Sequence, residues 1–253
     1  MAFLRAEELE AKLAPPPLPE PGTFAPGFSP CPDVRPARPA PLVVEARAPK
    51  APRPGALARP EARARLVHTF LHHELQAAEL FAWAVLAFPD TPEPFRRGLL
   101  RLAGEELEHL AAYRAHLATL GHAVGDWPVR DWFWERVPTC ADPLAFVAFV
   151  GVGLEGANLE HSARYAAAFR QAGDEPGAAL LERIEREEVS HVAFAVRWFR
   201  HFAGGFDFDR WRAALPTPIT PSILRGRPLN VPARRRAGLD EAFLAGLEAV
   251  PPA

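Results

Sequence analysis

The chain has 253 residues, 49% of them apolar, and is long enough to bury a sizeable core in one or two domains. Its formal charge of −2 gives no electrostatic case for nucleic acid or an anionic membrane as the main partner. Two cysteines, Cys31 and Cys140, are too few for a disulfide framework. The N-terminus has no apolar signal region, and the longest apolar run, residues 143–154, is shorter than the ~20 residues that span a bilayer. These features predict a soluble, cytoplasmic protein.

Proline dominates the N-terminal part of the chain. Fifteen of the 29 prolines lie at 14–60, where they nearly exclude helix and sheet, and a short amphipathic helix is expected before them at 5–14. The segment is either a disordered tail or an extended arm lying on the folded body. We favour the arm because it carries apolar anchors. These anchors are Leu42, Val43, Val44 and Leu57.

Four long helices with apolar stripes are predicted between residues 60 and 204. Thr91 and Asp142 are the expected N-caps of the second and third helices, because a proline follows each of them. Short joins make the first two and the last two helices antiparallel hairpins, whereas the tryptophan-rich join at 121–141 is long. A four-helix bundle with one long crossover is the ferritin-like topology. We therefore predict an all-α protein.

Three regions follow from this pattern. A Pro-rich N-terminal arm covers 1–59, the four-helix bundle covers 60–204, and a C-terminal extension covers 205–253. The extension is irregular except for a final helix, which is predicted at 238–249.

Two stretches repeat the pattern Glu-Glu-x-x-His: "EELEHL" at 105–110 and "EEVSHV" at 187–192. Residues three apart share one face of a helix, so the second Glu and the His of each motif point the same way. Both pairs fall within apolar rows of their helices. Charged side chains are rarely buried unless they are paired or bind a metal. The pattern therefore favours a metal site.

Each of the other two long helices offers one more carboxylate on its apolar row. Glu74 precedes Glu106 by 32 residues and Glu155 precedes Glu188 by 33, so the two hairpins look like diverged copies. Glu160 lies off the row, and we expect it to pair with Arg164. The predicted ligands are Glu74, Glu106, His109, Glu155, Glu188 and His191. The alternative is a metal-free bundle whose buried carboxylates pair with arginines.

Four carboxylates neutralise two divalent cations, and two imidazoles complete the set. Carboxylate and imidazole ligands without thiolate suit iron or manganese, with zinc as an occupant in vitro. We expect two metals about 3.5–4 Å apart. Four further residues are candidates to hydrogen-bond the ligands from behind. The four are Glu105, Glu187, His73 and Glu79. The alternatives are surface charge for Glu105 and Glu187, an additional ligand for Glu79, and for His73 a place lining the site or a partly buried histidine with its own partners. Tyr113, one turn after His109, is a candidate catalytic residue or a core side chain.

Two other clusters have alternative interpretations. Glycines 151, 153 and 156 surround Glu155 and indicate a helix distortion, room for a substrate, or close helix packing. We expect a cavity there. The C-terminal segment is basic, which predicts either salt bridges to an acidic surface or contact with phosphate or RNA. The arginines that carry this prediction are Arg225, Arg227, Arg234, Arg235 and Arg236.

The doubled motif resembles those of the ferritin-like dinuclear carboxylate proteins, such as rubrerythrin, the ribonucleotide reductase small subunit and bacterial monooxygenase hydroxylases. Five stretches are more narrowly similar to a ferritin-like family catalogued as a domain of unknown function. They are "LEAKLAPPP" (9–17), "HHELQAAEL" (72–80), "LEGANLEH" (154–161), "REEVSHVAFAVRWFRHF" (186–202) and "RRRAGLDEAF" (234–243). This resemblance covers nearly the whole chain. It implies the fold and the same six ligands, but no particular reaction.

We therefore expect an oxidoreductase that holds two iron ions and uses dioxygen or peroxide on a small-molecule substrate. The alternatives are an iron-handling or ferroxidase protein, a scaffold with a structural metal, and a ferritin-like RNA-modifying hydroxylase, which rests on fold analogy alone. No membrane partner is expected, nucleic acid is disfavoured, and a homodimer is left open.

Overall fold

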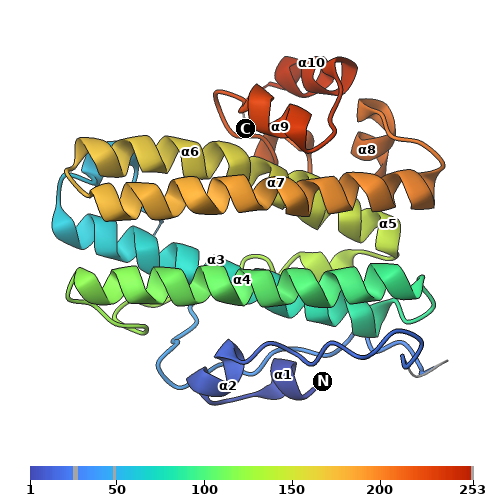
Figure 1. The fold of residues 1–253 in the computed structure, drawn as a ribbon, viewed down its shortest axis with the longest axis horizontal. Coiled ribbons are helices and arrows are strands. Elements are labelled where there is room, and N and C mark those ends of the chain that lie inside the picture. Colours follow the sequence, from blue (N-terminus) through green and yellow to red (C-terminus); the bar gives the residue numbers. More distant parts are fainter. Residues whose placement is uncertain (25–27, 48–49, 252–253) are drawn as a thin grey trace. The chain divides into compact units, whose positions relative to one another are not determined.

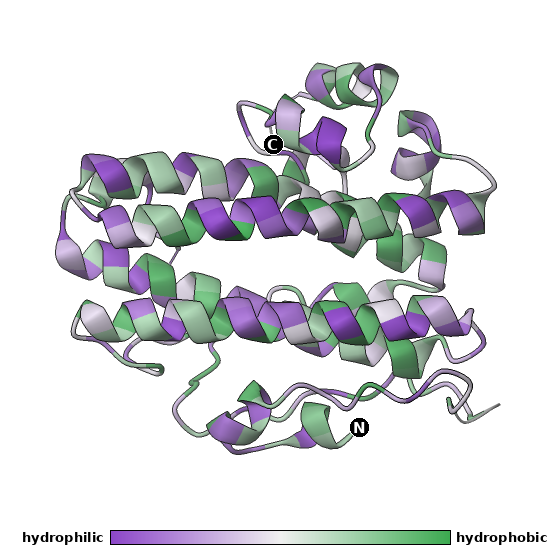
Figure 2. Ribbon diagram, in the orientation of Figure 1, coloured by the Kyte–Doolittle hydropathy of each residue, from purple (hydrophilic) through white to green (hydrophobic). Residues whose placement is uncertain are grey.

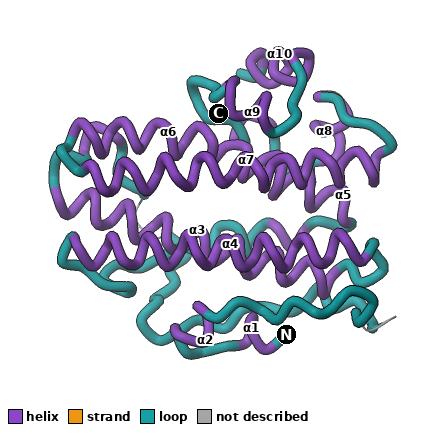
Figure 3. The backbone as a smooth tube through the Cα atoms, in the orientation of Figure 1, coloured by secondary structure: helices purple, strands orange, loops and turns teal. Residues whose placement is uncertain are grey.

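A computed structural model describes residues 1–24, 28–47 and 50–251. In these ranges the regular structure is helical, and the β-structure amounts to one isolated parallel bridge between Val44 and Val129 (Figures 1 and 3). This confirms the all-α prediction. The chain divides into two compact units, Met1–Pro138 and Thr139–Ala253. The predicted division into arm, bundle and extension stays a prediction.

The first unit is built on the hairpin of α3 (Pro60–Ala87) and α4 (Glu93–Thr119), which matches the first two predicted helices. Pro60 occupies the first helical position, where its missing N–H costs nothing. The N-cap of α4 is Pro92, so the prediction of Thr91 was wrong. The Thr91 hydroxyl instead donates to the carbonyl of Phe88 at 2.7 Å, which closes the turn after α3.

The N-terminal arm lies along this hairpin. It begins with two short helices, α1 (Ala2–Arg5) and α2 (Leu9–Leu13), and later forms one 3₁₀ turn, η1 (Pro54–Ala56). The backbone N–H of Cys31 donates to the carbonyl of Leu86 at 2.9 Å, and the indole of Trp83 donates to the carbonyl of Pro32 at 2.9 Å. These contacts support an ordered arm.

Two of the four predicted anchors hold the arm. Leu42 and Leu57 are buried, whereas the side chains of Val43 and Val44 are 56% and 40% exposed. The backbone explains the difference, because the carbonyl of Val43 accepts a hydrogen bond from the N–H of Val129 at 2.9 Å. This segment is attached through its main chain, and the valines point outward.

The second unit begins with one continuous helical run. It passes through α5 (Pro143–Phe146), a π-helix η3 (Val147–Glu155) and α6 (Gly156–Gln171), and after a short turn α7 (Glu175–Ala203) follows. Asp142 caps the run, since its carboxylate accepts from the N–H of Ala145 at 2.8 Å, as predicted. Gly204 ends α7 in the left-handed conformation with φ of 67°.

The C-terminal extension contains four short elements and packs on its own unit. These are α8 (Phe208–Ala214), η4 (Pro221–Ile223), α9 (Val231–Arg236) and α10 (Glu241–Ala249). The last helix starts at Glu241, later than predicted, because the carboxylate of Asp240 caps it by accepting from the N–H of Phe243 at 2.8 Å. The indole of Trp211 donates to the carbonyl of Ala148 in the π-helix at 2.9 Å.

One helical stretch, Pro143–Gln171, is long and apolar enough to cross a membrane by length and composition. However, 72% of its most apolar window is buried inside the protein, which is typical of a core helix of a soluble protein. Both α4 and α7 carry apolar and polar residues along their whole length, as expected for amphipathic helices (Figure 2). The cytoplasmic location stays a prediction.

Candidate metal centre

The first unit brings three predicted ligands together. Glu74 lies on α3, and Glu106 and His109 lie one turn apart on α4. One ligand atom from each of the three lies within 4.8 Å of the other two. The Nδ1 atom of His109 is 3.4 Å from Oε2 of Glu106. The hairpin therefore gathers three side chains that could bind a metal.

The second unit repeats this arrangement. Glu155 is the last residue of the π-helix, and Glu188 and His191 lie one turn apart on α7. Their ligand atoms also lie within 4.8 Å of one another, and Nδ1 of His191 is 3.1 Å from Oε2 of Glu188. None of the six predicted ligands is more than 6% exposed.

The short His–Glu distances have two chemical explanations. They fit an ion pair between a protonated imidazole and a carboxylate, and they also fit two ligands of one cation. Ligands bonded at about 2.1 Å and at right angles to each other stand about 3 Å apart. Each half offers two carboxylates and one imidazole, a donor set that suits iron, manganese or zinc. The residues present therefore fit a metal.

Asn158 is a site residue that the sequence analysis missed. Its Nδ2 donates to Oε1 of Glu188 at 3.0 Å, and its Oδ1 accepts from the hydroxyl of Ser162 at 3.1 Å. The signal was present in the sequence, because Asn158 is one turn after Glu155 and Ser162 one turn later on the same helical face.

Two of the interpretations of the glycines beside Glu155 hold at once: the helix is distorted there, and it is closely packed. The helix is π-helical from Val147 to Glu155, so the predicted distortion is confirmed. A Cβ added at Gly151 would lie 2.3 Å from the Cβ of Ala195, and one added at Gly153 would lie 2.8 Å from Leu224. Neighbouring side chains fill these positions, so Gly151 and Gly153 serve close packing, and the predicted cavity near Glu155 stays a prediction.

Four other predicted residues have varied surroundings. Tyr113 is buried on α4, with its ring 5.8 Å from that of Phe70. His73 is half-buried, with its ring 5.0 Å from that of Phe133. Glu105 and Glu187 are exposed on their helices.

Glu79 is buried, but its carboxylate is engaged by the arm. Lys12 Nζ lies 2.6 Å from Oε1 of Glu79, Arg38 Nη1 lies 2.7 Å from the same atom, and the indole of Trp134 donates to Oε2 at 2.9 Å. Arg38 also binds Asp131 through its Nε and Nη2 atoms. These cations explain the burial of Glu79 without a metal.

Glu160 does not pair with Arg164 as predicted. It is buried, and Arg234 donates to it with two nitrogens, from Nε to Oε1 at 2.7 Å and from Nη2 to Oε2 at 2.8 Å. The backbone N–H groups of Gly226 and Asn230 donate to the same carboxylate at 3.1 and 2.9 Å. The prediction failed because the partner comes from the distant C-terminal extension.

The C-terminal arginines are used within the protein, but among the described residues only Arg234 and Arg236 form the predicted kind of ion pair with the long helices. Arg235 pairs with Glu241 at 2.5 Å, and Arg236 lies 3.6 Å from Glu185. Arg225 donates to the carbonyls of three residues in the last described turn. Those residues are Leu247, Glu248 and Val250.

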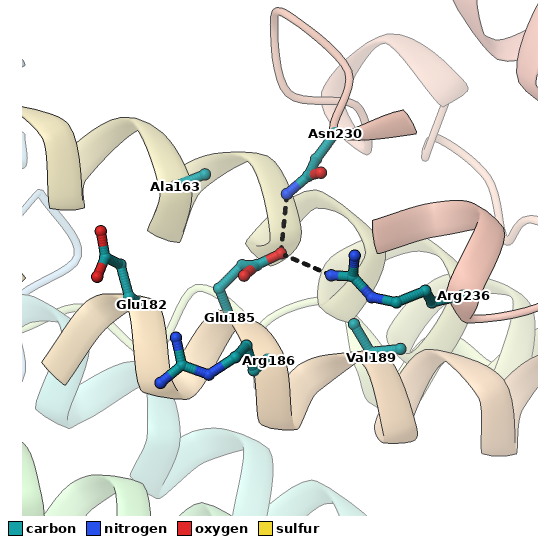
Figure 4. Close-up of a pocket in the computed structure, with 7 residues that line it drawn as sticks. All are labelled: Ala163, Glu182, Glu185, Arg186, Val189, Asn230 and Arg236. Atoms are coloured by element: carbon teal, nitrogen blue, oxygen red, sulfur yellow. Dashed lines mark hydrogen bonds and ion pairs between the residues drawn. The ribbon is translucent and has the colours of Figure 1, made fainter. Parts of the chain in front are cut away.

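A surface pocket of about 750 Å³ lies in the second unit, between α7, α6 and the segment leading into α9 (Figure 4). Its charges compensate one another: Glu185 accepts from the amide of Asn230 at 2.9 Å, and Glu182 pairs with Arg170 at 2.9 Å. It contains none of the six predicted ligands. Its lining is Ala163, Glu182, Glu185, Arg186, Val189, Asn230 and Arg236.

Comparison with curated proteins and with solved structures returned no match. A family model described as "Protein of unknown function (DUF455)" matches residues 6–245, which is nearly the whole chain and includes all six predicted ligands. The chain therefore belongs to this family.

Proposed function

We propose that this protein is a ferritin-like dinuclear metal protein that acts as an oxygen- or peroxide-dependent oxidoreductase on a small molecule. The two half-sites would jointly hold two iron ions, with manganese as an alternative. The proposal requires that the four long helices form a ferritin-like bundle. Its ligands are Glu74, Glu106, His109, Glu155, Glu188 and His191.

One observation carries the proposal: each unit separately gathers two carboxylates and one imidazole, in the same order along the chain. The matching ligand atoms lie within 4.8 Å in both halves. A single Glu-x-x-His motif on a helix is common, but two such buried sets at matched spacing are not expected by chance. Four carboxylates supply the charge that two divalent cations need.

When bound, a di-iron centre supplies electrons to dioxygen or peroxide. The chain's own residues would hold the ligands in place and keep the centre dry. Leu102 and Leu110 on α4, and Ile184 and Ala195 on α7, are buried on the helices that carry the motifs. This apolar packing excludes water, which protects a reactive oxidant from side reactions.

Oxidation of iron itself is the second candidate function. It is favoured by the side chains that fill the space beside Gly151 and Gly153, because a ferroxidase needs a path for ions and not a cavity for an organic substrate. The RNA-modifying alternative loses support, since Arg234 and Arg235 are bound within the protein.

The test is to load metal-free protein with Fe(II) without oxygen, measure the metal content, and then expose it to oxygen. We expect two irons per chain and an optical change within seconds. Glu106→Ala and Glu188→Ala should each lose most of the metal, and Glu108→Ala, an exposed change on α4, should keep it.

Full metal content in the Glu106→Ala, Glu188→Ala double variant would reject the site. If the iron-loaded protein consumes no oxygen, the oxidoreductase role is rejected and the metal is structural. If mineral particles grow, the result favours iron storage.

A further inference from the structure

The amide of Asn158 has a fixed orientation beside Glu188. Its Oδ1 accepts from the Ser162 hydroxyl at 3.1 Å, so its amino group is the part that faces Glu188. That group donates to Oε1 of Glu188 at 3.0 Å. Asn158 and Ser162 both lie on α6, one turn apart, so the helix sets the position of the donor.

The other oxygen of the same carboxylate faces the imidazole. Oε2 of Glu188 is 3.1 Å from Nδ1 of His191. The amide therefore occupies one oxygen of Glu188 and leaves the other beside the ring nitrogen, where both atoms can bind one cation. A hydrogen bond of this kind fixes the orientation of a ligand before the metal arrives.

The positions of α3 that correspond to Asn158 and Ser162 cannot form the same pair. The residue three positions after Glu74, which corresponds to Asn158, is Ala77, and the residue that corresponds to Ser162 is Phe81. Neither side chain can donate a hydrogen bond. The distance from His109 Nδ1 to Glu106 Oε2 is also longer, at 3.4 Å.

We propose that Asn158 is a positioning residue that makes the two half-sites unequal, so that the first divalent cation binds at Glu188 and His191. This inference rests on the proposed metal site. It goes further by assigning an order of filling and a residue that sets the order.

The experiment is a titration of metal-free, full-length protein with Co(II), followed by calorimetry and by the visible absorbance of the bound ion. Wild-type protein should bind two ions in two separate steps. Asn158→Ala should weaken the tighter step about 10- to 100-fold, which is typical for loss of a residue that orients a ligand, and should weaken the other step less.

Ser162→Ala tests the same device with a smaller change. It should weaken the tighter step by less than Asn158→Ala does, because the amide stays but is no longer held. Ser190→Ala is the matched control: this hydroxyl is adjacent to His191 in the chain but bonds the carbonyl of Glu187, and the variant should titrate like wild type.

The outcomes separate the inference from the proposed function. Wild-type protein that binds no Co(II) would reject the metal site. If wild-type protein binds two ions but the tighter step is unchanged in both Asn158→Ala and Ser162→Ala, the positioning role is rejected and the metal site stands. Equal weakening of both steps, or a lower melting temperature of metal-free Asn158→Ala, would show that Asn158 serves the fold instead.

Discussion

His68 is buried on α3, where its Nε2 accepts a hydrogen bond from the backbone N–H of Gly125 at 2.9 Å. Only the neutral ring can accept, and burial together with the nearby His72 lowers the pKa of His68 from 6.5 to about 4. His68 is therefore harder to protonate in the folded protein than in the unfolded chain.

This pKa shift predicts acid sensitivity. Between pH 6.5 and about 4 the unfolded state binds a proton at His68 that the folded state does not, so the free energy of unfolding falls as the pH drops through this range. The full effect is about 3 kcal/mol, because one pKa unit corresponds to ~1.4 kcal/mol.

Urea unfolding of metal-free protein near neutral pH and at about pH 4 measures this loss in the free energy of unfolding. His68→Gln, whose side-chain oxygen can also accept from Gly125, should lose less stability on acidification. Identical losses in the variant and wild type would place the acid sensitivity elsewhere.

The side chains around the candidate site show what the sequence could and could not predict. Glu106, His109, Glu188 and His191 could be assigned to a buried face because helical periodicity fixes which residues point together. The partner of Glu160 could not, since Arg234 lies 74 residues away and helical periodicity relates only neighbours within one element.

At the scale of elements, the long helices were predictable because their ends carry local signals. The carboxylates of Asp142 and Asp174 cap the helices that follow them, and both interactions involve residues three apart in the chain. From the sequence, a helix distortion was only one of several interpretations of the glycines at 151–156. The sequence near them does not show that Ala195 and Leu224 pack against this part of the helix.

Close packing at the π-helix predicts that Gly151→Ala destabilises the protein. The added methyl would lie 2.3 Å from the Cβ of Ala195, too close without movement of the backbone. We expect a loss of about 1–3 kcal/mol in the free energy of unfolding, the usual cost of overpacking.

Gly55→Ala is the control for this change, since apart from the adjoining backbone no atom lies within 4 Å of the added methyl. Chemical denaturation of the two variants compares them directly. A Gly151→Ala variant as stable as Gly55→Ala would mean that α7 can move away from the π-helix at little cost.

At the scale of the whole molecule, the arm is attached by a buried ion cluster and not by apolar contacts alone. Lys12 is fully buried between the carboxylate of Glu79 and the carbonyl of Leu4, at 2.6 and 2.8 Å. The apolar anchors Leu42 and Leu57 could be predicted from composition. The ion cluster could not, because Lys12 and Glu79 lie 67 residues apart.

Lys12→Met should release the start of the arm. Removing one partner of a buried ion pair is costly, and we expect a loss of about 2–3 kcal/mol, at or just below the usual range, because Arg38 and Trp134 still hold Glu79. Limited proteolysis should then cleave the arm faster. The chain's other lysine, Lys50, is exposed, so Lys50→Met should behave like wild type. Equal cleavage of both variants would show that the arm does not depend on this ion pair.

The four donors on Glu160 also affect how the protein is made. Gly226, Asn230 and Arg234 are synthesised long after Glu160, and until they leave the ribosome its carboxylate lacks the partners that allow its burial. The contacts within the first unit can form as residues up to 138 emerge, whereas the contacts of Glu160 in the second unit must wait for Arg234. Until then the carboxylate of Glu160 stays hydrated and α6 cannot complete its packing there, so the nascent second unit is where a chaperone would be needed.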